Sequence, residues 1–276
     1  METGVNYGAR VWDKVPSSYT NTIGSLTEAM LNAGVKDLVP RSTVWDVMSG
    51  PGLLTGEVLK SRPDLKVVLI DRVGELLAQA QEKFGDSVSI FRRDVREGFE
   101  GIEIKSDVAL VRYGLKDLGR QSLPLVLQSL KENCPRLVVG DMTANNAEDA
   151  KMFTDIHLEK QRLGGRDIRP LNEGGDGECY IPCTAEWIQL LHEAGYNPST
   201  IRNEWNGLSV VPTQKWVESH QVKPEDIIGM NKFILKTVGR KRFERFGVEI
   251  LKRDSYRNPL NVGISFPIGV FRANSN

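Results

Sequence analysis

Three parts of the chain carry the residue types that hold a nucleotide-like ligand. Residues 46–52 read Asp-Val-Met-Ser-Gly-Pro-Gly, so an acid precedes two closely spaced glycines. Glycine lets a ligand approach the backbone and accepts positive φ angles that other side chains oppose. Asp71 lies further along the chain, and Asp94 follows within residues 91–95. An acid that follows such a loop can accept hydrogen bonds from ribose hydroxyls, although each acid on its own could simply cap a strand end.

The pattern of apolar runs indicates how these residues are positioned. Short runs rich in Val, Ile and Leu alternate with helical stretches, and they occupy residues 43–47, 66–71, 87–91, 107–111 and 137–141. Buried parallel strands with crossover helices produce this rhythm, and right-handed crossovers give an open, doubly wound α/β sheet. The carboxyl ends of neighbouring strands line one crevice in such a sheet. We therefore expect the glycine loop and both acids to meet at one edge.

Taken together, residues 40–142 resemble the class I S-adenosylmethionine-dependent methyltransferases. The first motif of that family is an acid followed by three alternating glycines. Asp46, Gly50 and Gly52 match it, whereas Met48 stands where the first glycine is usual. The resemblance implies a Rossmann-like, mostly parallel seven-stranded sheet. It also implies S-adenosylmethionine as the cofactor and S-adenosylhomocysteine as the product.

The same resemblance assigns contacts to the cofactor. Gly50 and Gly52 would lie under the methionine part and Asp71 would hold the ribose. Asp94 and Val95 would address the adenine. The remaining expected cofactor contacts are Asp46, Met48, Arg72 and Arg112.

A nicotinamide dinucleotide is the competing ligand, because the glycines at 50, 52 and 56 also resemble some dehydrogenase loops. Three observations oppose it. The first strand stands behind a helical arm, Asp94 has an obvious role only in the methyltransferase interpretation, and no Tyr-x-x-x-Lys pair occurs in the chain.

The residues that would act on the methyl acceptor are less sharply indicated. Methyl transfer from a sulfonium is an in-line displacement that needs alignment, exclusion of water and sometimes a base. Residues 111–117 resemble the segment of small-molecule O-methyltransferases in which Leu-His-Asp supplies a histidine, and Lys116 takes that histidine's place. A charged lysine is a poor base unless burial lowers its pKa, so Lys116 is either a fixed cation or an exposed residue that opens the next helix. His157, on a helix expected at 147–163, is the other candidate proton acceptor; a packed or solvated histidine is the alternative.

Aromatic residues are expected around the acceptor. Tyr7, Trp12 and Tyr19 lie on the N-terminal arm, which similar enzymes fold over the cofactor as a lid; here they could instead anchor the arm. The predicted substrate contacts are Tyr7, Tyr19, Tyr113 and His157.

The domain organisation follows from the same patterns. We expect a helical arm over residues 1–40 and a methyltransferase domain over 41–276, with a helical insertion at 208–250. One last strand is expected at 261–271, where Pro267 argues for an edge position or a bulge.

Composition narrows the class of partner. Lys+Arg and Asp+Glu both number 36, so nothing supports a broad nucleic-acid footprint. No apolar run is long enough to span a membrane, no secretory signal is recognisable, and a cytoplasmic location is expected. Three cysteines are too few for a disulfide framework, and Cys179-x-x-x-Cys183 with His192 lacks the pairs of a zinc site, so no metal is expected. An arm of this length could cover a neighbouring subunit's site in a homo-oligomer.

Three functions remain open on the sequence. The first is methyl transfer to an O, N or C atom of a small, largely apolar metabolite, for instance in secondary metabolism. The second is a cyclisation or rearrangement that binds S-adenosylmethionine without transferring its methyl group, suggested by Lys116. The third is a binding protein that keeps the cofactor site without catalysis.

Overall fold

The computed structural model describes most of the chain. The described residues are 17–165, 167–169, 179–204, 211–212, 224–240, 246, 249–251, 261–264 and 268–275. The predicted contacts Tyr7 and Trp12 lie outside them. Among the described residues no helix is both long enough and apolar enough to cross a membrane.

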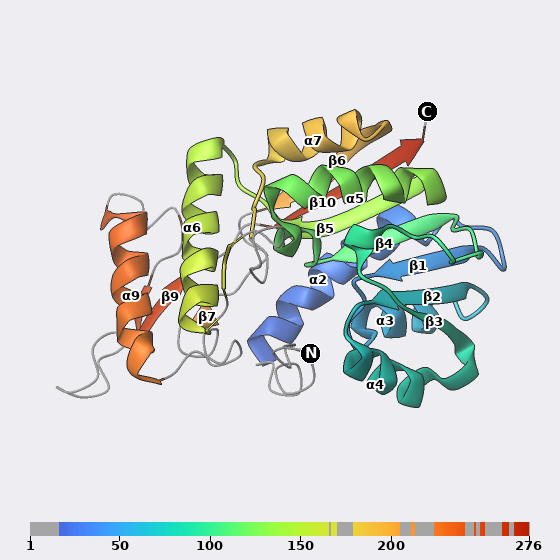
Figure 1. Ribbon diagram of the computed structural model, residues 1–276, viewed down its shortest axis with the longest axis horizontal. Coiled ribbons are helices and arrows are strands. Elements are labelled where there is room, and N and C mark those ends of the chain that lie inside the picture. The colour runs from blue at the N-terminus through green and yellow to red at the C-terminus, as the bar shows by residue number, and fades with distance from the viewer. Residues whose placement is uncertain are drawn as a thin grey trace.

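A seven-stranded sheet forms the centre of the larger part of the molecule (Figure 1). Its order is β3-β2-β1-β4-β5-β10-β6, and β10 runs antiparallel to both of its neighbours. The strands are β1 (Thr43–Val47), β2 (Lys66–Asp71), β3 (Val88–Arg92), β4 (Val108–Arg112), β5 (Arg136–Met142), β6 (Tyr196–Glu204) and β10 (Ile268–Ser275). The predicted doubly wound, mostly parallel seven-stranded sheet is thereby confirmed.

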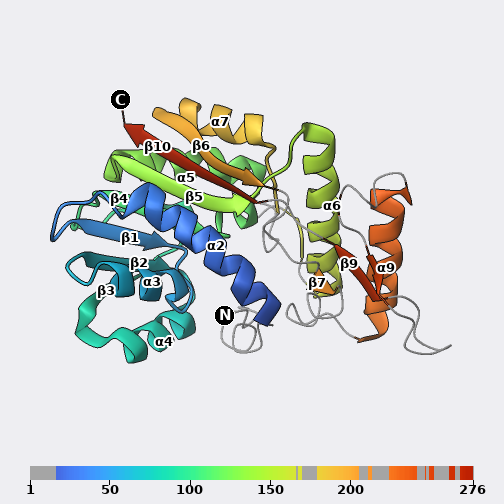
Figure 2. The same ribbon diagram turned by 180° about the vertical axis from the view of Figure 1, so that it is seen from behind.

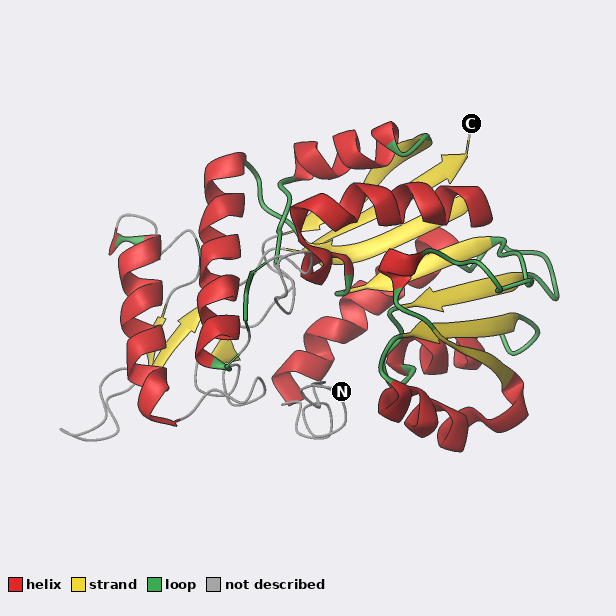
Figure 3. Cartoon of the chain, viewed as in Figure 1, coloured by secondary structure: helices red, strands yellow, loops and turns green. Residues whose placement is uncertain are grey.

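Helices cover both faces of this sheet, as Figure 3 shows. One face packs against α2 (Ser17–Gly34), α3 (Leu53–Ser61) and α4 (Gly74–Phe84), and the other against α5 (Gly119–Asn133) and α7 (Thr184–Glu193). The side chains of the strands alternate between the two cores. Val44 of β1 joins the first core, whereas Trp45 and Val47 join the second. Burial on both faces explains why the strands read as almost continuous apolar runs.

Helix α2 belongs to the first core from Leu26 onward. Leu26 and Met30 are buried in that core, and α2 packs against β5 (Figure 2). The predicted contact Tyr19 lies on this helix, but its side chain is outside the described part. A domain boundary at residue 40 stays a prediction.

A second group of elements stands beside the sheet. Helices α6 (Ala147–Leu163) and α9 (Pro224–Val238) lie next to a small sheet of order β7-β9-β8, made of β7 (Val211–Pro212), β8 (Glu249–Leu251) and β9 (Asn261–Ile264) (Figure 1). Phe153 of α6 meets Phe246 edge-on, with ring centroids 5.4 Å apart. We call these elements the side lobe.

Two expectations about the last third of the chain were wrong. The region 208–250 contains the short strands β7 and β8 as well as helix α9, so it is not purely helical. The single strand expected at 261–271 is two strands in different sheets. Of the two alternatives expected for it, the edge position is wrong because β10 is interior, whereas the pairing of β10 with β6 does have a bulge-like register shift between Val270 and Phe271. An unbroken apolar run does not show which sheet each half joins, because both halves are extended and apolar. The residue that motivated the edge assignment, Pro267, lies outside the described residues.

Candidate functional site

The loop after β1 has the backbone that its glycines suggest. Gly50 and Gly52 have φ angles of 54° and 74°, and Met48 has 58°. Met48 therefore holds the left-handed conformation that a glycine would adopt more easily, which accounts for the glycine usual at this place. Strained backbone of this kind often accompanies a functional loop.

The two matching glycines face different surroundings. A Cβ atom on Gly52 would lie 2.6 Å from the ring of Phe84 and 3.1 Å from Leu69, so this glycine is needed for close packing on the core. Among the residues that the structure describes, a Cβ atom on Gly50 would meet Leu76 alone, at 3.8 Å. Gly50 is thus the one of the pair that borders space which a ligand could enter.

Asp46 lies behind the loop. Its Oδ2 accepts hydrogen bonds from the amide of Thr55, at 3.0 Å, and from the Thr55 hydroxyl, at 2.6 Å. Burial raises the pKa of Asp46 to about 6, although the bonds from Thr55 oppose that shift. The acid of the glycine motif therefore ties β1 to the first turn of α3.

Asp71 connects the ends of β1 and β2. Its two carboxylate oxygens accept hydrogen bonds from the amides of Gly50, at 2.8 Å, and Val73, at 2.9 Å. Burial raises its pKa, and these two bonds counteract the rise. A carboxylate has about four lone-pair positions, so about two remain for a ligand. Asp71 lies beside Gly50, as the predicted ribose contact requires.

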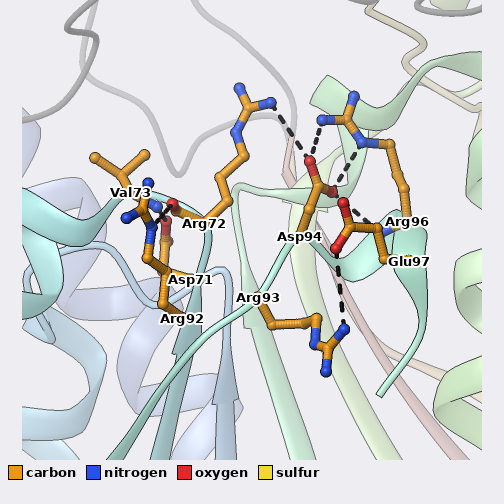
Figure 4. Close-up of polar contacts among 8 residues, drawn as sticks. All are labelled: Asp71, Arg72, Val73, Arg92, Arg93, Asp94, Arg96 and Glu97. Carbon is orange, nitrogen blue, oxygen red and sulfur yellow. Dashed lines mark hydrogen bonds and ion pairs between the residues drawn. The ribbon is translucent and has the colours of Figure 1, made fainter. Parts of the chain in front are cut away.

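Asp94 is held by arginines (Figure 4). Its Oδ1 accepts bonds from the Arg96 amide, at 3.1 Å, and from Arg96 Nε, at 2.8 Å, and its Oδ2 pairs with the other end of the same guanidinium. Arg72 Nη1 stands 3.8 Å from that Oδ2. Burial opposes ionisation, but Arg96 outweighs it and the pKa of Asp94 is lowered. Adenine recognition by Asp94 would require Arg72 to move, while the neighbouring Val95 is buried in the core.

The end of β4 is linked to the arm helix. Arg112 Nη1 donates to the hydroxyl of Thr27 on α2, at 2.7 Å, and the positive charge of Arg112 acts on Asp46. Tyr113 has a positive φ of 57°, and its amide donates to the carbonyl of Gly140. The loops after β1 and β4 also touch, because Met48 packs against Gly114.

Lys116 is buried and charged. Its Nζ donates to the carbonyl of Tyr113, at 2.6 Å, and to Asp117 Oδ2, at 2.9 Å, while its amide bonds Asp141. Burial alone would lower the pKa of Lys116, but Asp117 and Asp141 outweigh it and raise the pKa. The alternative of an exposed lysine is therefore wrong, and a lysine held in this way does not give a free amine.

His157 lies opposite this lysine, on α6. It is buried, and Lys160 Nζ stands 3.0 Å from its Nε2. An ammonium group can only donate, so a charged Lys160 engages the lone pair of that ring nitrogen. Gln161 on the same helix reaches Asp117 at 3.5 Å. Together η3 (Leu115–Leu118) and α6 enclose a buried polar network.

The network includes residues that the sequence did not indicate, namely Asp117, Asp141, Lys160, Gln161 and Cys179. Asp117 could have been found from its place in the Leu-Lys-Asp segment, and Asp141 from its place at a strand end. Lys160 and Cys179 carry no such signal, because only the packing of α6 and of residues 179–183 brings them here.

Asp117, His157 and Cys179 have donor atoms within 4.8 Å of one another, a spacing that could hold a metal ion. The ammonium groups of Lys116 and Lys160 already bond two of these three residues. Of the residues weighed for zinc from the sequence, Cys179 belongs to this cluster, whereas Cys183 precedes α7 and His192 is in the last turn of that helix.

Comparisons with known proteins bear on the fold. No family model and no curated protein sequence matches the chain. Among solved structures, YcgJ of Bacillus subtilis matches with a TM-score of 0.69 at 12% identity, covering 92% of this chain and 99% of that one. BH2331 of Bacillus halodurans C-125, described as a candidate methyltransferase, gives 0.67 at 15% identity, covering 92% and 100%. A complex of DhpI with SAM and HEP gives 0.50 at 17% identity, covering 71% and 89%.

The first two of these likenesses each cover 92% of this chain. The chain has the fold of the class I S-adenosylmethionine-dependent methyltransferases.

Proposed function

We propose that the chain transfers a methyl group from S-adenosylmethionine to a small molecule. The observation that carries the proposal is the loop after β1, where Gly50 borders open space and its amide is held by Asp71. Supporting it, DhpI, which shares the fold, forms complexes with SAM and with SAH.

The residues of the loop fit the cofactor. The Oγ atom of Ser49 is buried and has no hydrogen-bond partner among the described residues. A buried hydroxyl without a hydrogen-bond partner raises the free energy of the folded protein. A polar ligand group that bonds the Ser49 hydroxyl would remove this unfavourable contribution. Asp71 retains lone pairs for the ribose hydroxyls. The charge of Arg112 acts on Asp46, and the guanidinium of Arg112 could donate hydrogen bonds to the carboxylate of the methionine part.

When bound, S-adenosylmethionine supplies a methyl group on a sulfonium, which needs an aligned nucleophile more than it needs acid–base catalysis. The chain's contribution at the acceptor end would come from Tyr113, η3 and α6. Lys116 would act as a fixed cation that sets the position of Asp117 and of the Tyr113 carbonyl. It would not act as a base.

His157 would receive a proton only indirectly. Its Nε2 faces Lys160, so a proton from the acceptor would reach this nitrogen after Lys160 moves or gives up a proton of its own. Acceptors that lose their proton readily, such as phenols, or that are nucleophilic when neutral, such as amines, suit this arrangement best. The balanced net charge of the chain favours a small acceptor over a nucleic acid.

The experiment is incubation of the full chain with S-adenosylmethionine and a panel of phenols, indoles and amines. Release of S-adenosylhomocysteine that depends on an acceptor, and is lost in Asp71→Ala, is expected. Acceptor turnover without release of S-adenosylhomocysteine would indicate that the chain catalyses a rearrangement rather than methyl transfer. Binding of the cofactor with no turnover of any acceptor would indicate a binding protein.

A further inference from the structure

Four arginines gather at the carboxyl ends of β2 and β3 (Figure 4). A cavity of about 270 Å³ lies there, lined by Arg72, Arg92, Arg93, Asp94 and Glu97. Three guanidinium groups thus face two carboxylates. We call this place the arginine cavity; the fourth arginine, Arg96, borders it through Asp94.

The two carboxylates do not neutralise the three arginines. Asp94 is occupied by Arg96, which bonds both of its oxygens. Glu97 is 69% exposed and stands 3.9 Å from Arg93, a distance at which an ion pair in water contributes little. Positive charge is therefore left over inside the cavity.

Arg92 is the least neutralised of the group. Its Nε donates to the backbone carbonyl of Arg72, at 3.2 Å, and in the described ranges no carboxylate lies within ion-pairing distance of it. Arg72 is 46% exposed and is no closer than 3.8 Å to Asp94. Arg72 and Arg92 both line the cavity, and guanidinium groups with unused donors are well suited to bind a phosphate group.

The position of the cavity identifies what would carry the phosphate. In the parallel pairing of β2 and β3, Arg92 is the register partner of Asp71. Arg72 follows Asp71 directly. A ribose with one hydroxyl bonded to Asp71 would therefore direct a phosphate on the neighbouring hydroxyl toward Arg72 and Arg92. S-adenosylmethionine has no phosphate, so its binding would leave these two arginines without an anion.

We propose that the arginine cavity binds a phosphate group on the ribose of an adenine nucleotide, and that such a nucleotide competes with S-adenosylmethionine. The placement of the ribose rests on the proposed function. The enzyme would therefore bind less S-adenosylmethionine when adenine nucleotides with a 2′- or 3′-phosphate are abundant.

The test compares adenosine with adenosine 2′-monophosphate and adenosine 3′-monophosphate as competitors of S-adenosylhomocysteine, by calorimetry on the full chain. At least one phosphorylated nucleoside should bind about tenfold more tightly than adenosine, because two charged forks contact it. Arg92→Gln should abolish that preference and leave the affinity for S-adenosylhomocysteine within about twofold. Lys60→Gln, which removes one charge from an exposed site on α3, should change neither value.

Equal affinity for adenosine and both phosphates would overturn the proposal, as would a preference that survives in Arg92→Gln. Inorganic phosphate that binds as tightly as the phosphorylated nucleosides would also overturn it, since the ribose would then be irrelevant. If the proposed function itself is wrong, the unaltered chain will not bind S-adenosylhomocysteine. That result differs from each of the outcomes that overturn the proposal about the arginine cavity.

Discussion

Asp46 and Asp141 are carboxylic acids buried at the ends of β1 and β5, and burial raises the pKa of each to about 6. Neither is compensated by a full ion pair of its own: Asp46 relies on Thr55, and Asp141 accepts the amides of Lys116 and Met142. Such acids hold the loops of the site in place at some cost to stability. That cost depends on pH and can be measured.

The first prediction concerns this pH dependence. The folded pKa of Asp46 is about 6 and its ordinary value is 3.8, so the unfolded chain releases its proton first as pH rises. The stabilising contribution of the protonated acid is present below about pH 4 and is lost by about pH 6, a change of about 3 kcal/mol. Urea unfolding between pH 4 and 7 should show this decline in the unaltered chain and a smaller one in Asp46→Asn.

Asp64→Asn is the matched control, because Asp64 lies at the surface in an ion pair with Arg62, which lowers its pKa. This variant should retain the decline between pH 4 and 6. An equal decline in Asp46→Asn would contradict the assignment of the titration to Asp46.

The second residue-scale prediction concerns His157. If a proton reaches this buried ring, His157→Ala should lower kcat by about 100-fold, while affinity for S-adenosylhomocysteine is retained. Lys151→Ala, on the exposed face of the same helix, is the control. Turnover that persists without His157 would show that proton removal occurs elsewhere or is not needed.

At the scale of elements, the loops after β1 and β4 are in contact through Met48 and Gly114. A Cβ atom on Gly114 would lie 2.7 Å from Met48 Sδ and 2.8 Å from Met48 Cβ. The third prediction is that Gly114→Ala lowers the free energy of unfolding by about 1–3 kcal/mol. In a Met48→Gly background the same change should cost much less, because both crowded atoms are gone.

Urea unfolding of the two single variants and the double variant measures this coupling. An equal cost of Gly114→Ala in both backgrounds would mean that the two loops adjust independently. Met48→Gly alone also tests the strained backbone at residue 48, since glycine holds its φ of 58° without a steric penalty.

The same elements show what could be predicted from sequence. The central strands and the place of Asp71 followed from local patterns, because each strand is buried on both faces and ends at a polar residue. The network around His157 did not, because Gln161 and Cys179 meet Asp117 only through the packing of α6 against residues 179–183. The division of residues 261–275 between two sheets depends on the pairing of β10 with β5 and β6, which are far away in sequence.

At the scale of the molecule, the two apolar cores lie on opposite faces of the sheet, and the first of them continues into α6 and α9 of the side lobe. Phe153 is buried against Phe246 in the side lobe, whereas Phe99 packs against Trp45 beneath the sheet. The fourth prediction is that Phe153→Ala, which should cost about 3–5 kcal/mol, speeds amide exchange first in α6 and α9. Phe99→Ala should instead speed exchange in β1 and β4.

Hydrogen exchange with peptide-level resolution distinguishes the two variants. Exchange that rises equally in both regions for either variant would show that the side lobe and the sheet open as one unit. Because α6 carries His157, loss of activity at an intact cofactor affinity should accompany the opening of the lobe in Phe153→Ala.

The place of β10 in the sheet has a consequence for how the protein is made. β6 is joined to the sheet through β10, and β10 is the last of the seven strands to leave the ribosome. Until residues 268–275 emerge, β5 and β6 both expose unpaired strand edges, which readily associate with other chains. A nascent chain of this protein would therefore need protection of these edges until β10 has emerged, and a stop codon before residue 268 would yield an aggregating product rather than a smaller enzyme.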